Sequence, residues 1–206
     1  MARRTKAEAE QTRSLILDTA ERVFAAKGVS RTTLADIAQA AGLTRGAIYW
    51  HFDNKVDLLE ALQARVLLPL EEEFARLAEA DDPLEGLRQR CVQDLVELAG
   101  NDQKRRVLDV MLHKCEYVDD IGGLCTRVDS HCERLMQQLT RVLEHAAARG
   151  QLAIGLAPDT LARVLHGFML GIISDWLFNP ARYDLAAEAE RLTSTLFHGW
   201  RGMPSA

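Results

Sequence analysis

The sequence predicts an all-α protein, with a three-helix N-terminal helix-turn-helix module followed by a six-helix domain. The chain has 206 residues but only 5 proline and 13 glycine residues. Apolar residues recur at helical spacing through most of the chain, and no alternating run is long enough to indicate a strand. Hydrophobic residues make up 48% and charged residues 27%, which is typical of a globular protein with a core.

Three short helices are predicted within the first 52 residues. Apolar residues spaced by one and two turns predict the first of them: Ile16, Ala20, Val23 and Phe24. Thr33 begins the second, and its spacing to Asp36 resembles a capping box. Gly42 ends that helix, and Thr44 caps a third helix that we expect to run to residue 52. Two short helices joined by a turn with glycine predict a helix-turn-helix at about residues 33–52.

Six longer helices are predicted behind this module, each with a recognisable start or end. Asn54 caps the first of them, Asp82-Pro83 opens the second, Gly150 ends the fourth and Pro158 starts the fifth. We expect them at about 55–80, from 83 onward, 103–112, 124–149, 158–178 and 184–200. The sequence therefore predicts a DNA-binding domain at 1–54 and a second domain at 55–206.

The third helix indicates how such a module could read DNA. On a helical wheel, Ile48 faces the core of the module, whereas Gly46 and Trp50 lie roughly opposite, with Arg45 and Tyr49 beside them. Large exposed aromatic residues suit packing against sugar-phosphate or a thymine methyl group, and an arginine can donate two hydrogen bonds to guanine. A glycine lets a backbone approach closely. The alternative is that the two aromatic residues pack on the following helix.

The neighbouring positions leave more than one interpretation open. His51 could contact a phosphate or cap another helix. Lys55 begins the long helix, where its charge and free backbone N–H groups suit a phosphate.

Charge is distributed unevenly along the chain. The net charge of −5 argues against nucleic-acid binding over the whole surface. Residues 1–55, however, hold nine Lys/Arg against six Asp/Glu, whereas the remainder holds 16 against 24. A basic end on an acidic body indicates one surface for phosphate and another with a different task.

The segment TTLADIAQAAGLTRGAIYWHFDNKVDLL (Thr32–Leu59) resembles the signature of the TetR family of bacterial regulators. MARRTK at the start, HKCEYVDD (His113–Asp120) and DWLFNPARYDL (Asp175–Leu185) resemble its AcrR-like subgroup, which represses multidrug efflux pump genes. The resemblance implies a ligand-responsive repressor that binds palindromic double-stranded operator DNA as a homodimer and is released by a hydrophobic small-molecule inducer.

The resemblance also implies which residues meet DNA, namely Thr33, Thr44, Arg45, Gly46, Tyr49, Trp50, His51 and Lys55. Arg3, Arg4 and Lys6 would form a mobile basic tail that adds phosphate or minor-groove contacts, or else a solvated terminus.

A ligand cavity and a dimer interface are expected in the second domain. Met and Leu give a pliable apolar wall, and the candidates are Val66, Leu67, Leu70, Cys91, Leu95, Leu108, Met111, Leu112, Leu135, Leu139, His166, Met169, Leu170 and Ile173. The alternative for each is ordinary core. Relatives that take cations often carry an acid where this chain has Leu67, and Arg90, Asp94 and Asp109 are the polar residues nearby, each expected at the surface. The dimer candidates are Leu161, Leu165, Phe168, Ile172, Trp176, Leu192 and Leu196.

Other classes of function find less support. No phosphate-loop, HExxH or GxSxG motif is present, so we expect neither an enzyme nor a cofactor. His113, Cys115, His131 and Cys132 lack a recognised zinc spacing, and a redox role for Cys115, Cys125 or Cys132 is an open alternative. No apolar run approaches the roughly 20 residues of a membrane helix, and no signal peptide is seen, so we expect a cytoplasmic protein.

Two alternatives for the function itself are open. The chain could be a TetR-type regulator of a metabolic or other non-efflux operon. It could also be a ligand-binding module without DNA function, although the set of Arg45, Tyr49 and Lys55 argues against this.

Overall fold

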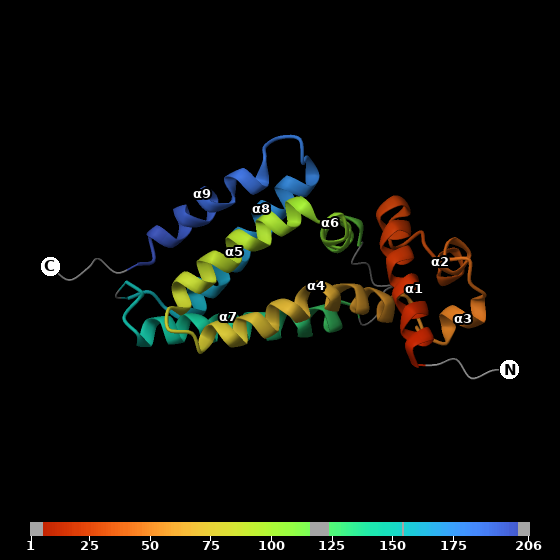
Figure 1. The fold of residues 1–206 in the computed structure, drawn as a ribbon, viewed down its shortest axis with the longest axis horizontal. Helices are drawn as coiled ribbons and strands as arrows, with labels where there is room; N and C mark the ends of the chain where they lie inside the picture. Colours follow the sequence, from red (N-terminus) through yellow and green to blue (C-terminus); the bar gives the residue numbers. More distant parts are fainter. Residues whose placement is uncertain (1–5, 116–123, 154, 202–206) are drawn as a thin grey trace. The chain divides into compact units, whose positions relative to one another are not determined.

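The computed structural model describes residues 6–115, 124–153 and 155–201, with side chains described outside 124–131. These ranges are almost wholly helical (Figure 1), so the predicted all-α class is confirmed. The helices are α1 Lys6–Lys27, α2 Leu34–Ala40, α3 Arg45–Tyr49, α4 Lys55–Ala78, α5 Pro83–Gly100, α6 Asp102–Asp109, the π-helical turn η1 Val110–Lys114, α7 Leu124–Ala148, α8 Pro158–Phe178 and α9 Leu185–His198.

The described residues fall into two compact units. The first contains residues up to 66 together with 106–129, and the second contains 67–105 together with 130–206. The expected division at residue 54 is a division by function, and it stays a prediction.

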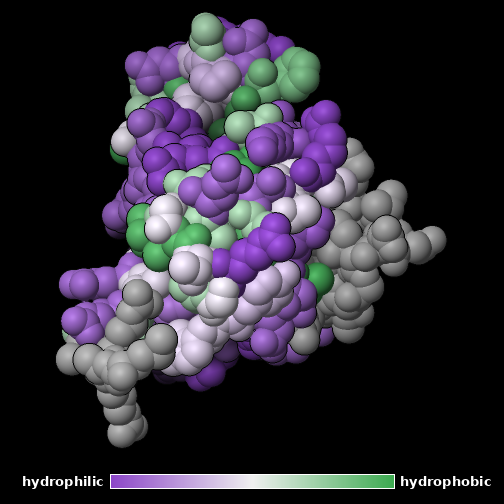
Figure 2. Space-filling view, turned by 90° about the vertical axis from the view of Figure 1, so that its right-hand side faces the viewer, coloured by the Kyte–Doolittle hydropathy of each residue, from purple (hydrophilic) through white to green (hydrophobic). Residues whose placement is uncertain are grey.

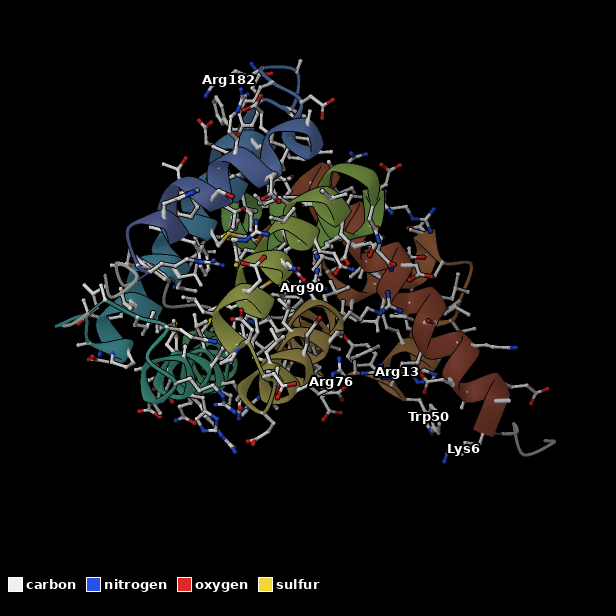
Figure 3. All side chains as sticks on the ribbon, turned by 60° about the vertical axis from the view of Figure 1, so that its left-hand side comes forward. Lys6, Arg13, Trp50, Arg76, Arg90 and Arg182 are labelled. Carbon is white, nitrogen blue, oxygen red and sulfur yellow. The ribbon has the colours of Figure 1, made fainter. Side chains whose placement is uncertain are left out.

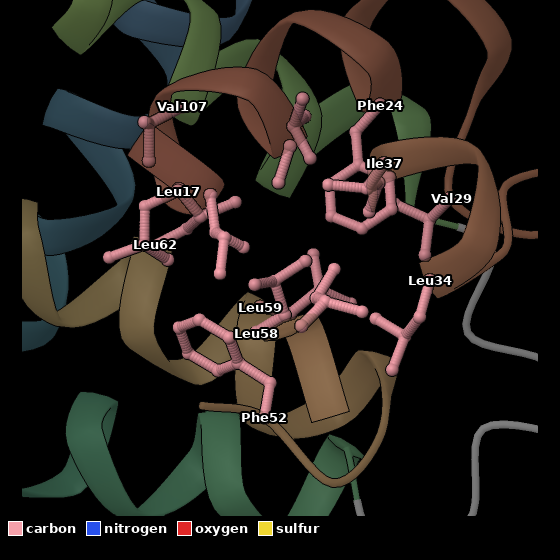
Figure 4. Close-up of a cluster of buried hydrophobic side chains, with 14 of the residues drawn as sticks. Leu17, Phe24, Val29, Leu34, Ile37, Phe52, Leu58, Leu59, Leu62 and Val107 are labelled. Atoms are coloured by element: carbon pink, nitrogen blue, oxygen red, sulfur yellow. The ribbon is translucent and has the colours of Figure 1, made fainter. Parts of the chain in front are cut away.

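The first unit is built on a core that α1 shares with α2, α3, the start of α4 and the end of α6 (Figure 4). Phe24 of α1, Ile37 of α2 and Ile48 of α3 are fully buried there, with Leu59 of α4. Met111 of η1 also packs into this cluster. The short helices of the module are therefore held by shared apolar packing, because isolated helices of this length are marginal in water.

Side-chain caps fix where these short helices begin. Thr33 Oγ1 accepts a hydrogen bond from Asp36 N (3.1 Å), and Asp36 Oδ2 accepts one from Thr33 N (2.8 Å), which confirms the capping box. Thr44 Oγ1 accepts from Ala47 N at 3.2 Å, and Asn54 Oδ1 accepts from Val56 N at 2.8 Å. The three predicted caps are thus confirmed.

Some boundaries differ from those predicted. The third helix ends at Tyr49 instead of residue 52, because His51 N donates to Ile48 O and so tightens the last turn. The predicted helix 103–112 is instead α6 followed by the wider turn η1. Gly42 has φ +68°, a left-handed conformation that glycine adopts without strain, and it forms the turn between α2 and α3.

The second unit has its own core. Helices α5 and α9 lie side by side in it (Figure 1). Its buried residues come from most of its helices: Phe74, Leu84, Leu87, Cys91, Leu139, Val142, Leu143, Leu161, Leu165, Phe197 and Trp200. An isolated antiparallel bridge joins Leu152 to Arg201.

The sequence analysis expected no apolar segment long enough to cross a membrane, and helix α8 differs from that expectation. Within the described residues it is long and apolar enough to cross a membrane by length and composition, and only 22% of its most apolar window is buried inside the structure. Such a helix is weak evidence for a membrane span, because core helices of globular proteins meet the same criterion.

Candidate nucleic-acid interface

Helix α3 presents the side chains that the wheel predicted. Thr44 caps its start, and Ile48 is fully buried below it, which fixes the rotation of the helix on the core. Tyr49 is 54% exposed and Trp50 is 71% exposed, although both are large aromatic residues. The alternative that Trp50 packs on the following helix is therefore not supported by its exposure.

Space around Gly46 is open. A Cβ atom added to Gly46 would meet only Thr44 Oγ1, at 4.0 Å. Internal packing therefore does not require a glycine here. A backbone without a side chain on an exposed face suits close approach by another molecule.

Two ring contacts lie at the C-terminal end of α3, one made by His51 and one by Arg13. The His51 ring stands nearly perpendicular to the Trp50 ring, with centroids 4.5 Å apart. The guanidinium of Arg13, from α1, lies 5.3 Å from the centroid of Phe52. Arg13 makes no hydrogen bond or ion pair with the described residues, so its charge is available at this surface. Figure 3 shows Arg13, Lys6 and Trp50 toward the same end of this unit.

Arg13 was not predicted from the sequence. Its signal is the spacing of seven residues from Lys6, which places both cations on one face of α1. Lys6 itself begins α1 and so belongs to a helix instead of the expected tail, whereas Arg3 and Arg4 lie outside the described residues. Figure 2 looks onto this end of the chain, where hydrophilic and near-neutral residues cover most of the face.

At the start of α4, hydrogen-bonding groups that the sequence analysis expected to be free already have partners within the protein. Asn54 Oδ1 accepts hydrogen bonds from the first N–H groups, at 2.8 Å from Val56 and 3.0 Å from Asp57. Lys55 Nζ donates to Val29 O (3.1 Å) and Ser30 O (3.3 Å). The expectation of free N–H groups is therefore wrong for Val56 and Asp57.

Thr33 is exposed at the start of α2. Its hydroxyl and backbone N–H both hydrogen-bond the Asp36 carboxylate, which lowers the pKa of Asp36 below its usual value. The carboxylate therefore stays charged at neutral pH and holds the α2 cap.

The ligand candidates are divided between the two units. Val66 and Met111 pack with the core of the first unit, and Cys91 and Leu139 belong to the core of the second. Leu95 is fully buried. The others are partly buried: Leu67, Leu70, Leu108, Leu112, Leu135, His166, Met169, Leu170 and Ile173. Burial lowers the pKa of His166, which favours its neutral form.

A buried ionic cluster occupies the second unit beside Cys91. Arg90 is only 7% exposed and bonds Glu73 (3.0 Å), Asp94 (2.9 Å) and Glu97 (3.1 Å). Lys104 bonds the last two carboxylates at 3.0 and 2.9 Å. Arg90 lies among the helices (Figure 3), so its expected place at the surface is wrong. Asp94 and Glu97 lie on α5 with Arg90, whereas Glu73 comes from α4, and this contact between two helices could not be predicted from spacing in the sequence.

The dimer candidates also divide by burial. Leu161, Leu165 and Trp176 are buried within their own unit, and Trp176 Nε1 donates to Tyr183 O at 3.2 Å. Phe168, Ile172, Leu192 and Leu196 are partly buried. On α8, Val164 is 45% exposed and Phe178 is 80% exposed, so part of the apolar surface of this helix lies at positions that the sequence analysis did not name.

The structure describes the side chains of some, but not all, of the candidates for redox or metal-binding roles. Cys91 is buried, and Cys115 and Cys132 are partly buried without a disulfide. The side chains of Cys125 and His131 lie outside the described residues. His113 Nδ1 lies 2.9 Å from Asp109 Oδ1, which places both of these residues in one local pair.

Two family models match the chain. Residues 16–62 match the bacterial regulatory proteins of the tetR family, and residues 82–200 match the C-terminal region of MAATS-type transcriptional repressors. The first match includes α2, α3 and the start of α4, and the second runs from α5 to the end of α9.

Named relatives are similar over nearly the whole chain. The HTH-type transcriptional regulator TtgR of Pseudomonas putida is 39% identical over 198 residues, which cover 95% of this chain and 94% of that protein. The HTH-type transcriptional regulator AcrR of Shigella flexneri is 35% identical over 199 residues, covering 95% and 92%.

Solved structures are similar as well. NalD, the secondary repressor of the MexAB-OprM multidrug efflux pump in Pseudomonas aeruginosa, matches with a TM-score of 0.84 and 33% identity, covering 95% of this chain and 98% of that chain. SmeT of Stenotrophomonas maltophilia in complex with triclosan matches with a TM-score of 0.86 and 32% identity, covering 94% and 93%. The identity and coverage of these matches show that the chain belongs to the TetR family of bacterial regulatory proteins.

Proposed function

We propose that this protein is a cytoplasmic repressor that binds palindromic operator DNA as a homodimer, controls a multidrug efflux operon and is released by a hydrophobic small molecule. The observation that carries DNA binding is the surface of α3. Arg45, Gly46, Tyr49 and Trp50 face solvent there, above a fully buried Ile48. Thr33 and Thr44 border it as exposed caps.

The chemistry of this surface fits duplex DNA. Arg45 supplies a fork of donors for a guanine edge or phosphates, and the aromatic rings supply flat apolar contacts. Arg13 and Lys6 add positive charge on α1 without a described acidic partner. A short helix with these side chains on one face suits the major groove.

The proposal of a dimer is supported by the exposed apolar residues of helix α8. On this helix Val164 and Phe178 are exposed and Phe168 and Ile172 are partly exposed, and apolar surface that is open to solvent in this way suits an interaction site. A second copy of this helix supplies that cover, and two copies place two recognition helices on two half-sites about 34–36 Å apart. Phe168 and Ile172 lie on the same helix and remain our interface candidates.

The efflux target and the hydrophobic ligand rest on the relatives. NalD and SmeT are named as repressors of multidrug efflux pumps, and SmeT was solved with triclosan. The partly buried apolar residues of the second unit, such as Leu135, Met169 and Ile173, fit an uncharged ligand of that kind.

A glycine substitution tests the DNA surface without disturbing the fold. Gly46→Ala finds open space, and alanine favours a helix by about 0.5–1 kcal/mol over glycine. We therefore expect equal or higher thermal stability, together with weaker binding to the DNA upstream of the protein's own gene in a gel shift. Gly100→Ala is the matched control, because it also finds open space and lies at the end of α5, outside the helix-turn-helix.

The outcomes separate the proposals. If Gly46→Ala binds this DNA as tightly as the wild type, the close approach at α3 is wrong. If the wild type binds neither this DNA nor any fragment recovered by genomic binding-site mapping, the repressor function is wrong.

A further inference from the structure

Within the described residues, α4 is the only helix with a proline in its interior, Pro69. Pro83 and Pro158 stand in the first turns of α5 and α8, and Pro180 follows the end of α8. In a first turn the missing N–H of proline costs no hydrogen bond, because that N–H has no helical partner anyway. Inside a helix, proline removes a hydrogen bond and its ring pushes against the carbonyl four residues earlier. Pro69 therefore weakens its helix locally, unlike the other three prolines.

The weakened point coincides with the boundary between the two units. The first unit includes α4 up to Val66, and the second unit begins at Leu67. In a regular helix, residue 69 donates its N–H to the carbonyl of residue 65, so the missing bond is one of those that would cross this boundary. Sharp bends in helices occur mostly at such positions. The backbone hydrogen bonds of α4 are therefore interrupted where the chain passes from one unit to the other.

Packing does not require a proline at this position. Pro69 is exposed, and its neighbour Leu68 is 45% exposed. A proline in a helix interior is strongly unfavourable compared with alanine, and an exposed ring returns no buried contact. The effect of Pro69 therefore lies in the backbone of α4 and not in the contacts of its side chain.

Before this point, α4 is fastened within the first unit. Leu58 and Leu62 are fully buried in its core. Arg65 Nη1 donates to Asp18 Oδ1 at 2.6 Å, and Arg65 Nη2 donates to Ser14 Oγ at 2.9 Å. Asp18 and Ser14 both belong to α1. The part of α4 that ends at Arg65 is therefore held to α1 by packing and by hydrogen bonds.

Beyond this point, α4 is fastened within the second unit. Arg90 of α5 donates to Glu73 Oε2 at 3.0 Å, and Arg134 of α7 donates to Glu71 Oε2 at 3.4 Å. Ala78, the last residue of α4, is fully buried. The part of α4 that begins at Glu71 is therefore held to α5 and α7.

We propose that residues 66–70 form a hinge in α4, created by Pro69, about which the first and second units turn relative to each other. The side chains of this segment, VLLPL, are all apolar, so none of them forms a hydrogen bond or an ion pair that would fix the bend. Helix α3 belongs to the first unit, so a change of bend carries it along. This inference rests on the proposed DNA binding only for its consequence, which is that the hinge sets the orientation of α3.

Hydrogen exchange in the free protein is the first test. Pro69→Ala supplies the missing N–H, so we expect the amides of Leu68 and Leu70 to exchange about tenfold more slowly than in the wild type. The rates are taken relative to the amide of Leu62 in the same helix, which corrects for any change in global stability. Pro158→Ala is the matched control, because it makes the same substitution in a first turn, where no hydrogen bond is gained. Equal relative rates in the wild type and Pro69→Ala would overturn the proposal.

The distance between two spin labels measures the bend directly. Labels on Glu60→Cys and Arg76→Cys lie on either side of the hinge, about 24 Å apart along a straight helix. The native cysteines other than the buried Cys91 are replaced by serine, and unlabelled protein is added in excess so that only distances within one chain are counted. We expect a broader distance distribution with Pro69 present than with Pro69→Ala, and no change of width with Pro158→Ala. Equal widths with and without Pro69 would rule out the hinge.

Adding DNA separates the hinge from its proposed use. When the duplex upstream of the protein's own gene binds, we expect the label distribution in the chain with Pro69 to narrow, because binding selects one bend from the ensemble. A bound complex with an unchanged width would overturn the role of the hinge in orienting α3. If no duplex binds, the proposed repressor function is wrong, and the measurements on the free protein still decide whether the hinge exists.

Discussion

Replacing Arg90 with methionine removes the guanidinium at the centre of the buried cluster of the second unit. Methionine retains much of the apolar stem of arginine, so the change removes charge and hydrogen bonds with little loss of packing. Glu73, Asp94 and Glu97 then lose bonds of 3.0, 2.9 and 3.1 Å. Lys104 remains bonded to Asp94 and Glu97.

The size of the effect follows from what each carboxylate keeps. Breaking a buried ion pair by removing one partner costs about 3–5 kcal/mol. Asp94 is the most buried of the three but keeps Lys104, whereas Glu73 and Glu97 are partly exposed and regain water. We therefore expect the low end, about 3 kcal/mol, which corresponds to a melting temperature lower by about 6–12 °C in a chain of this size.

Urea denaturation of Arg90→Met and the wild type measures this difference, and its pH dependence gives a second check. Burial raises the pKa of Glu97, but hydrogen bonds from Lys104 and Arg90 outweigh it, so its folded pKa lies below the ordinary value of 4.5. A depressed carboxylate pKa stabilises the folded state above the unfolded pKa, and that contribution is lost as the pH falls through the folded value. The difference between the two proteins should therefore be largest near neutral pH and shrink below about pH 4.5.

The control is Arg163→Met, which breaks an exposed pair with Asp159 separated by 4.0 Å. Pairs of this kind contribute about 0–1 kcal/mol. If Arg90→Met unfolds within that range of the wild type, the cluster does not stabilise the second unit and the reasoning above is wrong.

Two further substitutions and one labelling experiment test other parts of the molecule. Arg45→Ala should weaken operator binding by about 1–3 kcal/mol and relax base preference, measured by titration of operator and random duplexes; an equal loss on both would make Arg45 a phosphate contact. Phe168→Glu should shift the protein to monomers in analytical ultracentrifugation, and retained dimers would exclude that interface. Burial raises the pKa of the Cys91 thiol, so under native conditions at about pH 8 a thiol reagent should modify Cys115 and Cys132 before Cys91, and early labelling of Cys91 would contradict its place in the core.

Local patterns in the sequence predicted most of the helices. Caps such as Thr33, Thr44 and Asn54 accept hydrogen bonds from backbone groups two or three residues away. Both partners therefore lie in one short segment, and the cap can be predicted from that segment alone. The wheel of α3 succeeded for the same reason, because burial of Ile48 fixes which side of a short helix faces outward.

Features that depend on distant parts of the chain were missed. The bonds from Lys55 to Val29 and Ser30, and from Arg90 to Glu73, join separate helices, and neither pairing has a spacing that a single sequence could reveal. The DNA contact expected for Lys55 stays a prediction, because its ammonium donates to two carbonyls and keeps a third donor. The exposed Val164 and Phe178 of α8 were not among the predicted interface residues, because the rotation of that helix depends on its packing against other helices.

The three tryptophans differ in exposure, so the intrinsic fluorescence of the protein can report on binding at α3. Trp176 and Trp200 are each 5% exposed, whereas Trp50 at the end of α3 is 71% exposed. A soluble quencher such as acrylamide should therefore extinguish the emission of one indole almost selectively, and that indole stands on the proposed reading surface. Binding of duplex DNA would shield it, so quenching of intrinsic fluorescence can follow occupancy of α3 without a dye or a label.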